Sequence, residues 1–191
     1  MTKAPATKAA PSDREGASSH DDQVASFFSS CFGHLFSRPD QPAVWKAADI
    51  DFQQPAYRGV NAPQSILDTV DLEEWYRGRF WFRLLLNQPG PGGWSVLNGR
   101  YFPHQIVPRH WHDVEQVIIV QRGELRQGNR VFGPGDGYFT PAHQSYTITA
   151  GSEGAEFIEF RSCPIDAFAF EYDDENPSHW TSPATQAQGQ V

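Results

Sequence analysis

The chain has 191 residues, enough for one domain with a hydrophobic core and terminal appendages. Hydrophobic residues make up 39% of it and aromatic residues 14%, which excludes disorder along the whole chain. The formal net charge is −8 and the basic residues form no cluster, so we expect no nucleic-acid partner.

The cysteines and the hydropathy pattern bear on the cellular compartment. Cys31 and Cys163 stand far apart and form neither a metal-type spacing nor a disulfide framework. The N-terminus lacks the apolar core of a secretory signal, and no apolar run approaches the roughly 20 residues that span a bilayer. We therefore expect a soluble, cytoplasmic protein that makes no contact with a membrane.

The N-terminal part divides into a tail and an extension. Residues 1–22 are rich in small, polar and charged residues without periodicity, and this predicts a disordered tail. The extension, residues 23–78, begins with apolar residues at helical spacing: Val24, Phe27, Phe28, Cys31, Phe32, Leu35 and Phe36. This stripe predicts an amphipathic helix that docks on the main domain or on a second subunit. Its polar face lacks Lys and Arg, which argues against a membrane-surface helix. Acidic residues in DLEEWY predict a short helix over 71–76.

From Arg79 onward, short β-rich segments alternate with turns. The expected strands are RFWFRLLLN, WSVLNGRYF, EQVIIVQ, YFTP, YTITA and AEFIEFR, and the expected turns are PGPGG, RGE, RQGN, GPGDG and GSEG. Alternation in AEFIEF places Phe157 and Glu159 on one face. Strands at this spacing predict an all-β, antiparallel sandwich or barrel over residues 79–172, followed by a C-terminal tail at 173–191.

The order of these segments resembles the cupin superfamily, specifically the small single-domain cupins with a jelly-roll β-barrel. HWHDVEQVIIVQRG, residues 110–123, is similar to the first cupin motif. PGDGYFTPAHQSY, residues 134–146, is similar to the second. The resemblance covers about residues 94–161, and the two motifs are specific only in combination.

The resemblance implies a divalent metal in the mouth of the barrel. In cupins, the ligands are two histidines of the first motif, a glutamate four or five residues later, and a histidine of the second motif. Here this implies His110 and His112. Because alternate residues of a strand face the same side, His110, His112 and Gln116 would share the interior. Imidazole and oxygen ligands suit Fe(II), Mn(II), Ni(II) or Zn(II).

The sequence departs from the cupin pattern at two ligand positions. Gln116 stands where the glutamate is expected, and the neighbouring Glu115 would point outward from a regular strand. Tyr146 stands where the second motif has its histidine. Further candidates for the pocket are therefore His104, which would face inward if its strand is straight, together with His143 and Tyr138.

Three interpretations of these residues remain open. The site binds a metal, it has lost the metal and keeps a polar aromatic pocket, or the histidines only satisfy polar groups in the core. The first implies a metal-dependent enzyme acting on a small organic molecule, with Tyr146 as the catalytic proton donor or oxyanion partner. Its chemistry would be dioxygenase-like or, alternatively, that of a lyase or isomerase.

The alternative function is a non-catalytic module that binds or senses a small molecule. Its ligand cavity would be lined by Tyr138, Phe139 and Tyr146. Because cupins commonly pair through apolar strands such as RFWFRLLL, the resemblance also implies a homodimer.

Overall fold

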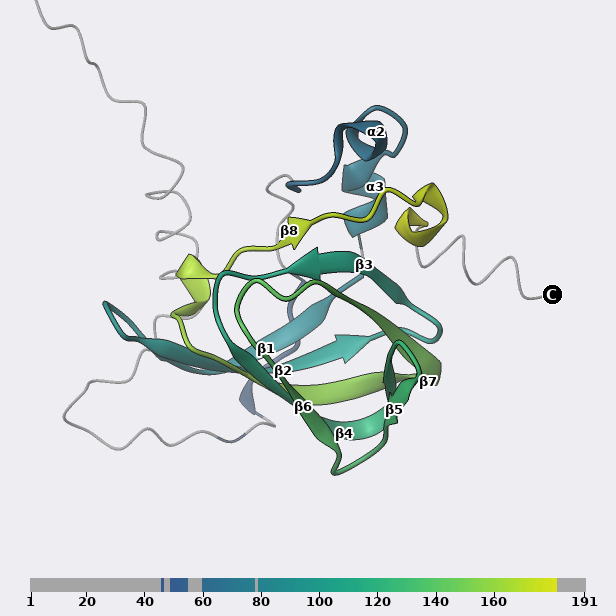
Figure 1. Ribbon diagram of the computed structural model, residues 1–191. Helices are drawn as coiled ribbons and strands as arrows, with labels where there is room; N and C mark the ends of the chain where they lie inside the picture. The colour runs from purple at the N-terminus through teal and green to yellow at the C-terminus, as the bar shows by residue number, and fades with distance from the viewer. Residues whose placement is uncertain (1–45, 47–48, 55–59, 78, 182–191) are drawn as a thin grey trace, which may run out of the picture.

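The computed structural model describes residues 46, 49–54, 60–77 and 79–181 (Figure 1). The predicted N-terminal tail and the predicted helix over 24–36 lie outside the described residues, as do residues 182–191.

Eight strands make up the sheet of the described chain. They are β1 (Trp81–Gln88), β2 (Trp94–Tyr101), β3 (Ile106–Trp111), β4 (Gln116–Gln127), β5 (Arg130–Phe132), β6 (Gly137–Thr140), β7 (Tyr146–Arg161) and β8 (Glu171–Tyr172). β1 and β2 match the predicted strands, and aromatic and leucine side chains occur in both of them.

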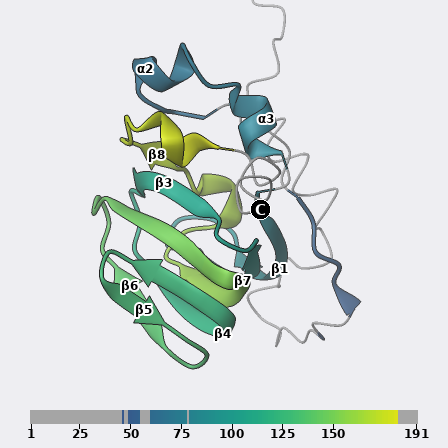
Figure 2. The same cartoon turned by 90° about the vertical axis from the view of Figure 1, so that its right-hand side faces the viewer.

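All pairings between these strands are antiparallel. The strand order is β1-β2-β7-β3-β8, and β4 pairs with β5, β6 and β7, so the sheet wraps round one interior (Figures 1 and 2). This confirms the predicted class, an antiparallel jelly-roll barrel. No helix in the described ranges is long and apolar enough to cross a membrane.

The predicted turn at GSEG is wrong, because β7 runs unbroken through it for 16 residues. Gly154 has a left-handed φ of 77° and lies against Gly123, whose φ is 69°. A Cβ on Gly123 would lie 2.1 Å from the carbonyl oxygen of Gly154. The two glycines thus let β4 and β7 bend where they cross, and both strands continue from one side of the barrel to the other. Gly123 for the same reason lies inside β4 and not in a hairpin turn.

The interior follows the alternation of the strands. Phe157 and Glu159 are both buried, as predicted, while Phe160 on the other face is exposed. Phe157 packs in the main core cluster with Leu84, Leu97 and Ile118, residues of three other strands. The core therefore fills one end of the barrel, and the polar residues described below lie nearer the other.

A second apolar cluster lies beside β8 and is built from short helices. α2 (Gln64–Leu67), α3 (Leu72–Tyr76) and the 3-10 helix η4 (Pro177–Trp180) supply its buried residues, Ile66, Leu72, Trp75 and Trp180. The predicted helix over 71–76 is present, and the side chain of Asp71 caps it by accepting a hydrogen bond from the N–H of Glu74.

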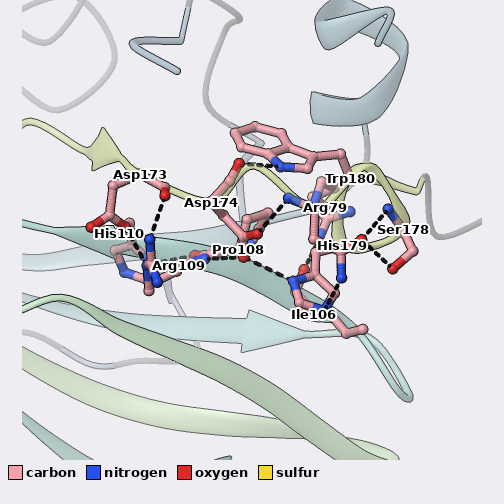
Figure 3. Close-up of polar contacts among 11 residues, drawn as sticks. Arg79, Ile106, Pro108, Arg109, His110, Asp173, Asp174, Ser178, His179 and Trp180 are labelled. Atoms are coloured by element: carbon pink, nitrogen blue, oxygen red, sulfur yellow. Dashed lines mark hydrogen bonds and ion pairs between the residues drawn. The ribbon is translucent and has the colours of Figure 1, made fainter. Parts of the chain in front are cut away.

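Asp174 fastens the C-terminal segment to β3 (Figure 3). Its carboxylate accepts hydrogen bonds from the N–H of Arg109 at 2.8 Å, from His179 Nδ1 at 2.8 Å and from the N–H of Asn176 at 3.0 Å. Although burial opposes ionisation, these donors hold the pKa of Asp174 below its ordinary value. Residues 173–181, which the sequence analysis assigns to a tail, are thereby part of the packed structure.

Candidate functional site

His110 and His112 project into the barrel from β3 and from the residue that follows it. Their side chains are buried, while Trp111 between them is half-buried and Asp113 is exposed. The alternation of an extended strand therefore places both imidazoles on the inner side, with ring centroids 5.0 Å apart.

Each of these imidazoles is oriented by a backbone carbonyl. His110 Nδ1 lies 2.7 Å from the carbonyl oxygen of Pro108, and His112 Nδ1 lies 2.7 Å from that of Ala169. A carbonyl only accepts, so each Nδ1 carries the proton and each Nε2 keeps its lone pair. Both rings are thus in the tautomer that binds a metal, or a donor group of a substrate, through Nε2.

Burial also keeps both rings neutral. It lowers the pKa of His110 to about 3, with the neighbouring His112 contributing in the same direction. Burial lowers the pKa of His112 to about 4. At neutral pH both residues are therefore unprotonated ligands, and no proton has to leave before Nε2 can donate its lone pair.

Gln116 and Tyr146 lie beside the histidines. Tyr146 pairs with His110 across β3 and β7, and the two rings are 4.5 Å apart. Gln116 Nε2 donates a hydrogen bond to the Tyr146 hydroxyl, which leaves Gln116 Oε1 and the phenolic proton for other partners. Burial, with the nearby carboxylate of Glu159, raises the pKa of Tyr146 well above its ordinary value. The hydroxyl is therefore a proton donor at neutral pH.

An inward-facing polar row crosses five strands at this end of the barrel. Its residues, in register from β6 to β1, are Thr140, Gln116, Arg161, Ser95 and Asn87. All five are buried. Among the described residues, Thr140 Oγ1 and Asn87 Nδ2 have no hydrogen-bond partner, and neither has the hydroxyl of Tyr138. Because buried polar atoms are ordinarily paired, these three are candidates to contact a ligand.

Arg161 and Glu159, which the sequence analysis did not single out as site residues, form a buried ion pair in the same interior. Arg161 Nε is 2.7 Å from Glu159 Oε1. The Arg161 guanidinium carbon also lies 3.5 Å from the centroid of the Phe168 ring. The alternation that places Glu159 inside also places Arg161 inside. The sequence pattern therefore could have predicted that Arg161 is an interior residue.

Aromatic residues of the segment after β7 cover the histidines. Phe168 lies 4.3 Å from His112 between ring centroids, and Phe170 lies 4.6 Å from His112 and 5.3 Å from His110. Tyr172 on β8 stacks on Phe170. The site therefore has a polar floor from the sheet and an aromatic wall from residues 168–172.

Two predicted pocket histidines lie elsewhere, which corrects the sequence-based expectation. His104 is exposed, has a φ of 56°, and lines a separate cavity of about 370 Å³ with Glu124, Arg126 and Gly151. His143 is exposed, has a φ of 62°, and its ring lies 5.1 Å from that of Trp111 on the outer side. At His104 the left-handed backbone breaks the alternation on which the expectation rested, whereas His143 was a candidate only through its place in the second motif.

The other predicted residues divide by face. Tyr138 is half-buried and packs against the core, whereas Phe139 is exposed on the outer face and does not line the interior. Glu115 is exposed, as expected from its parity. Within the described residues, no three His, Cys, Asp or Glu side chains come together as a metal site. The candidate site is therefore two histidines supplemented by an amide and a phenol.

Comparison with known proteins gives distant similarities. No family model and no curated protein matches the sequence. Among solved structures, the chain is similar to oxalate decarboxylase OxdC from Bacillus subtilis, with 25% identity over 46% of this chain and 26% of that chain, and a TM-score of 0.38. It is also similar to KdgF from Halomonas sp., with 14% identity over 44% of this chain and 81% of that chain, and a TM-score of 0.38. The chain thus spans about a quarter of the length of the decarboxylase. Likeness at this TM-score carries no argument about function.

Proposed function

Since the chain folds as a cupin-type barrel with both of its motifs on the wall of one interior, we propose that it is a metal-dependent enzyme acting on a small organic molecule. His110 and His112 are the protein's principal metal ligands, and Gln116 completes the coordination through Oε1. Tyr146 is the proton donor.

The observation that carries this proposal is the pair of fixed tautomers. Two buried, neutral imidazoles with Nδ1 bound to carbonyl oxygens form the outer-shell arrangement that orients histidine ligands around a metal. The donor set of imidazole and amide oxygen fits a divalent ion such as Zn(II), Ni(II), Fe(II) or Mn(II).

Gln116 and Tyr146 divide the remaining work. The amide N–H of Gln116 holds the hydroxyl oxygen of Tyr146, so the phenolic proton points to a third group. A bound metal supplies Lewis acidity that polarises an oxygen of the substrate. Tyr146, which keeps its proton because burial raises its pKa well above the ordinary value, would place that proton against the leaving or rearranging atom.

This division favours one reaction class. Lyase or isomerase chemistry needs a Lewis acid and a positioned proton donor, and His110, His112 and Tyr146 supply both roles. Dioxygenase-like chemistry, which the family resemblance implies first, needs a redox-active metal and makes no use of a protonated tyrosine. We therefore place the lyase or isomerase reaction first. The aromatic wall of Phe168 and Phe170 limits the substrate to a small molecule.

A specific observation favours a second candidate, a metal-free binding module. Within the described residues, no three His, Cys, Asp or Glu side chains come together as a metal site, and the buried carboxylate of Glu159 is paired with Arg161. The unpaired atoms of Tyr138 and Thr140 would then contact a small polar ligand directly.

Metal content separates the two candidates. Untagged protein purified without added metal is analysed for iron, manganese, nickel and zinc, beside the double variant His110→Ala/His112→Ala. The exposed His104→Ala serves as the control. The proposal requires near one metal per chain in the wild type and the control, and near none in the double variant. If none of the three proteins holds metal after loading with Zn(II) or Fe(II), the enzyme proposal is wrong and the metal-free binding module is favoured.

The homodimer also remains a proposal. It is supported by the position of β1 at one end of the strand order, where its pairing in the described chain beyond β2 is an isolated bridge to Gln53. Sedimentation of the full chain tests it. The cytoplasmic location remains a prediction from the sequence.

A further inference from the structure

The outer face of the sheet carries an apolar row across five strands. In register from β1 to β6, the row is Leu86, Val96, Phe160, Val117 and Phe139. Ile158 and Ile119 form a second apolar pair beside it on β7 and β4. Because these side chains alternate along their strands with those of the inward-facing polar row, they point away from the candidate site.

The two halves of this outer row differ in what covers them. Leu86 and Val96 are buried in a small cluster with Leu85, against which Ile50 from the segment before β1 packs. The other half is open: Phe160 is 43% exposed, Val117 is 36% exposed and Phe139 is 60% exposed. Adjacent large apolar side chains on a sheet surface mark a place where another element binds.

Polar residues border the outer row on both sides. Glu115 and Ser162 lie at one border, where the N–H of Ser162 donates to the carbonyl oxygen of Glu115. Arg122 and Glu156 lie as a register pair toward the other border. The open surface is therefore a narrow apolar band between polar margins. It matches an element with one apolar stripe and polar remaining faces, such as an amphipathic helix.

We infer that residues 24–36 of the same chain form this element and lie across the outer row. Their apolar stripe, Val24 to Phe36, is thirteen residues long, so as a helix it measures about 20 Å. The outer row crosses four inter-strand spacings, about 19 Å in all. The open half, from Phe160 to Phe139, crosses two of these spacings, about 10 Å, so the stripe is long enough to cover it.

The connection to the described chain permits this contact. Ile50 already lies on the covered half of the row, and nearby Gln53 is fixed by its bridge to Phe82. Thirteen residues separate Phe36 from Ile50 and reach at most about 45 Å. The open half begins one strand beyond Val96 and ends three strands beyond it, about 14 Å away. The docked stripe thus continues an existing contact between the N-terminal extension and the sheet.

Cys31, in the middle of the stripe, provides the test. Cys163, the other cysteine of the chain, is buried, and burial raises the pKa of its thiol to about 11, so it reacts slowly. In the full-length chain, Val117→Cys places a thiol under the inferred helix. The control, Val131→Cys, places one on β5, where the native side chain is 53% exposed. Both variants are treated with a short bifunctional maleimide, which joins two thiols by addition.

The expected product for Val117→Cys is an intramolecular link between positions 31 and 117, formed at least tenfold faster than any link in Val131→Cys. Peptide mapping locates it in chains that still migrate as monomers. Equal rates in the two variants would overturn the inference. So would covalent dimers through position 117, which would assign the outer row to a second copy.

A second pair of variants keeps the test independent of the introduced cysteines. Phe32→Asp puts a charge in the apolar stripe, and Ser30→Asp puts the same charge on the opposite face of the helix. The inference requires a several-fold rise in the fluorescence of a dye that binds apolar surface for Phe32→Asp, and no rise for Ser30→Asp. The same signal for both variants would contradict it.

Discussion

The Arg161 guanidinium makes two hydrogen bonds to the carboxylate of Glu159, which precedes it by two residues on the same face of β7. Nε lies 2.7 Å from Oε1, and Nη2 lies 3.1 Å from Oε2. Both side chains are buried inside the barrel. The pair places a guanidinium and a carboxylate beside the candidate site, and each compensates the other for its lost hydration.

Breaking this ion pair will destabilise the protein strongly. Arg161→Met leaves the Glu159 carboxylate buried without its partner, and we expect it to lower the free energy of unfolding by about 3–5 kcal/mol. The double variant Glu159→Leu/Arg161→Met removes both charges and should recover most of that loss. Urea unfolding of the single and double variants measures both effects. A loss below about 1 kcal/mol in Arg161→Met would contradict a buried ion pair at this position.

Restoring a carboxylate at position 116 will tighten metal binding. Gln116→Glu adds a negative charge beside two neutral imidazoles, so we expect the affinity for Zn(II) to rise tenfold or more. Glu115→Gln is the matched control, because that side chain is exposed and points away from the interior. Titration calorimetry on the metal-free proteins measures the affinities. Unchanged affinity in Gln116→Glu would remove position 116 from the coordination sphere.

Two tyrosines of the interior should respond in opposite ways to loss of the hydroxyl. Tyr138→Phe removes a buried hydroxyl without a partner, so we expect the free energy of unfolding to rise by about 1 kcal/mol. Tyr146→Phe removes the acceptor of the Gln116 amide, and we expect a loss of about 1–3 kcal/mol. Thermal unfolding without ligand compares the two. Equal changes of the same sign would contradict the assigned hydrogen bonding.

The histidines make the metal-free protein sensitive to acid. The pKa of His110 falls from 6.5 to about 3, and that of His112 falls from 6.5 to about 4, in both cases mainly through burial. As the pH drops below 6.5, the unfolded chain binds protons that the folded chain does not, so stability decreases until the folded pKa values are reached.

Thermal melting between about pH 7.5 and 5 checks this sign. His110→Phe should lose less stability over that range than the wild type, since one depressed pKa is removed. The exposed His104→Gln should behave like the wild type. If the stability of His110→Phe falls more steeply with decreasing pH than that of the wild type, the lowered pKa assigned to His110 is wrong.

The positions that sequence reasoning placed well depend on strand alternation alone. His110, His112 and Gln116 share one parity, and so do Phe157 and Glu159; the structure buries all five. His104 fails because it adopts a left-handed φ, which no pattern of side chains announces in a residue other than glycine. The prediction at Gly154 was wrong for the opposite reason, because a break was expected where the strand continues. Its cluster predicted a turn, whereas the sheet uses its freedom to bend a continuous strand.

Contacts between distant segments set the rest of the site. Asp174 and Trp180 sit in a stretch that is polar and rich in Asp, Asn and Ser, and their burial depends on Arg109 and Trp75, which lie far away in sequence. The same holds for Phe168, which meets His112 across 56 positions. Local periodicity in the sequence cannot predict such pairings, because it describes only one helix or strand at a time.

The bond from His112 to the carbonyl of Ala169 links the site to the order in which the chain is made. The acceptor lies 57 residues downstream of the imidazole, beyond the last long strand of the barrel. When β7 has been synthesised and has left the ribosome, the chain already contains both histidines. The carbonyl of Ala169, which fixes the tautomer of His112, is then still inside the ribosome. The binding geometry therefore matures only after the C-terminal segment has emerged and been fastened by Asp174. A product truncated before residue 169 keeps β1 to β7 but lacks β8 and the carbonyl that orients His112.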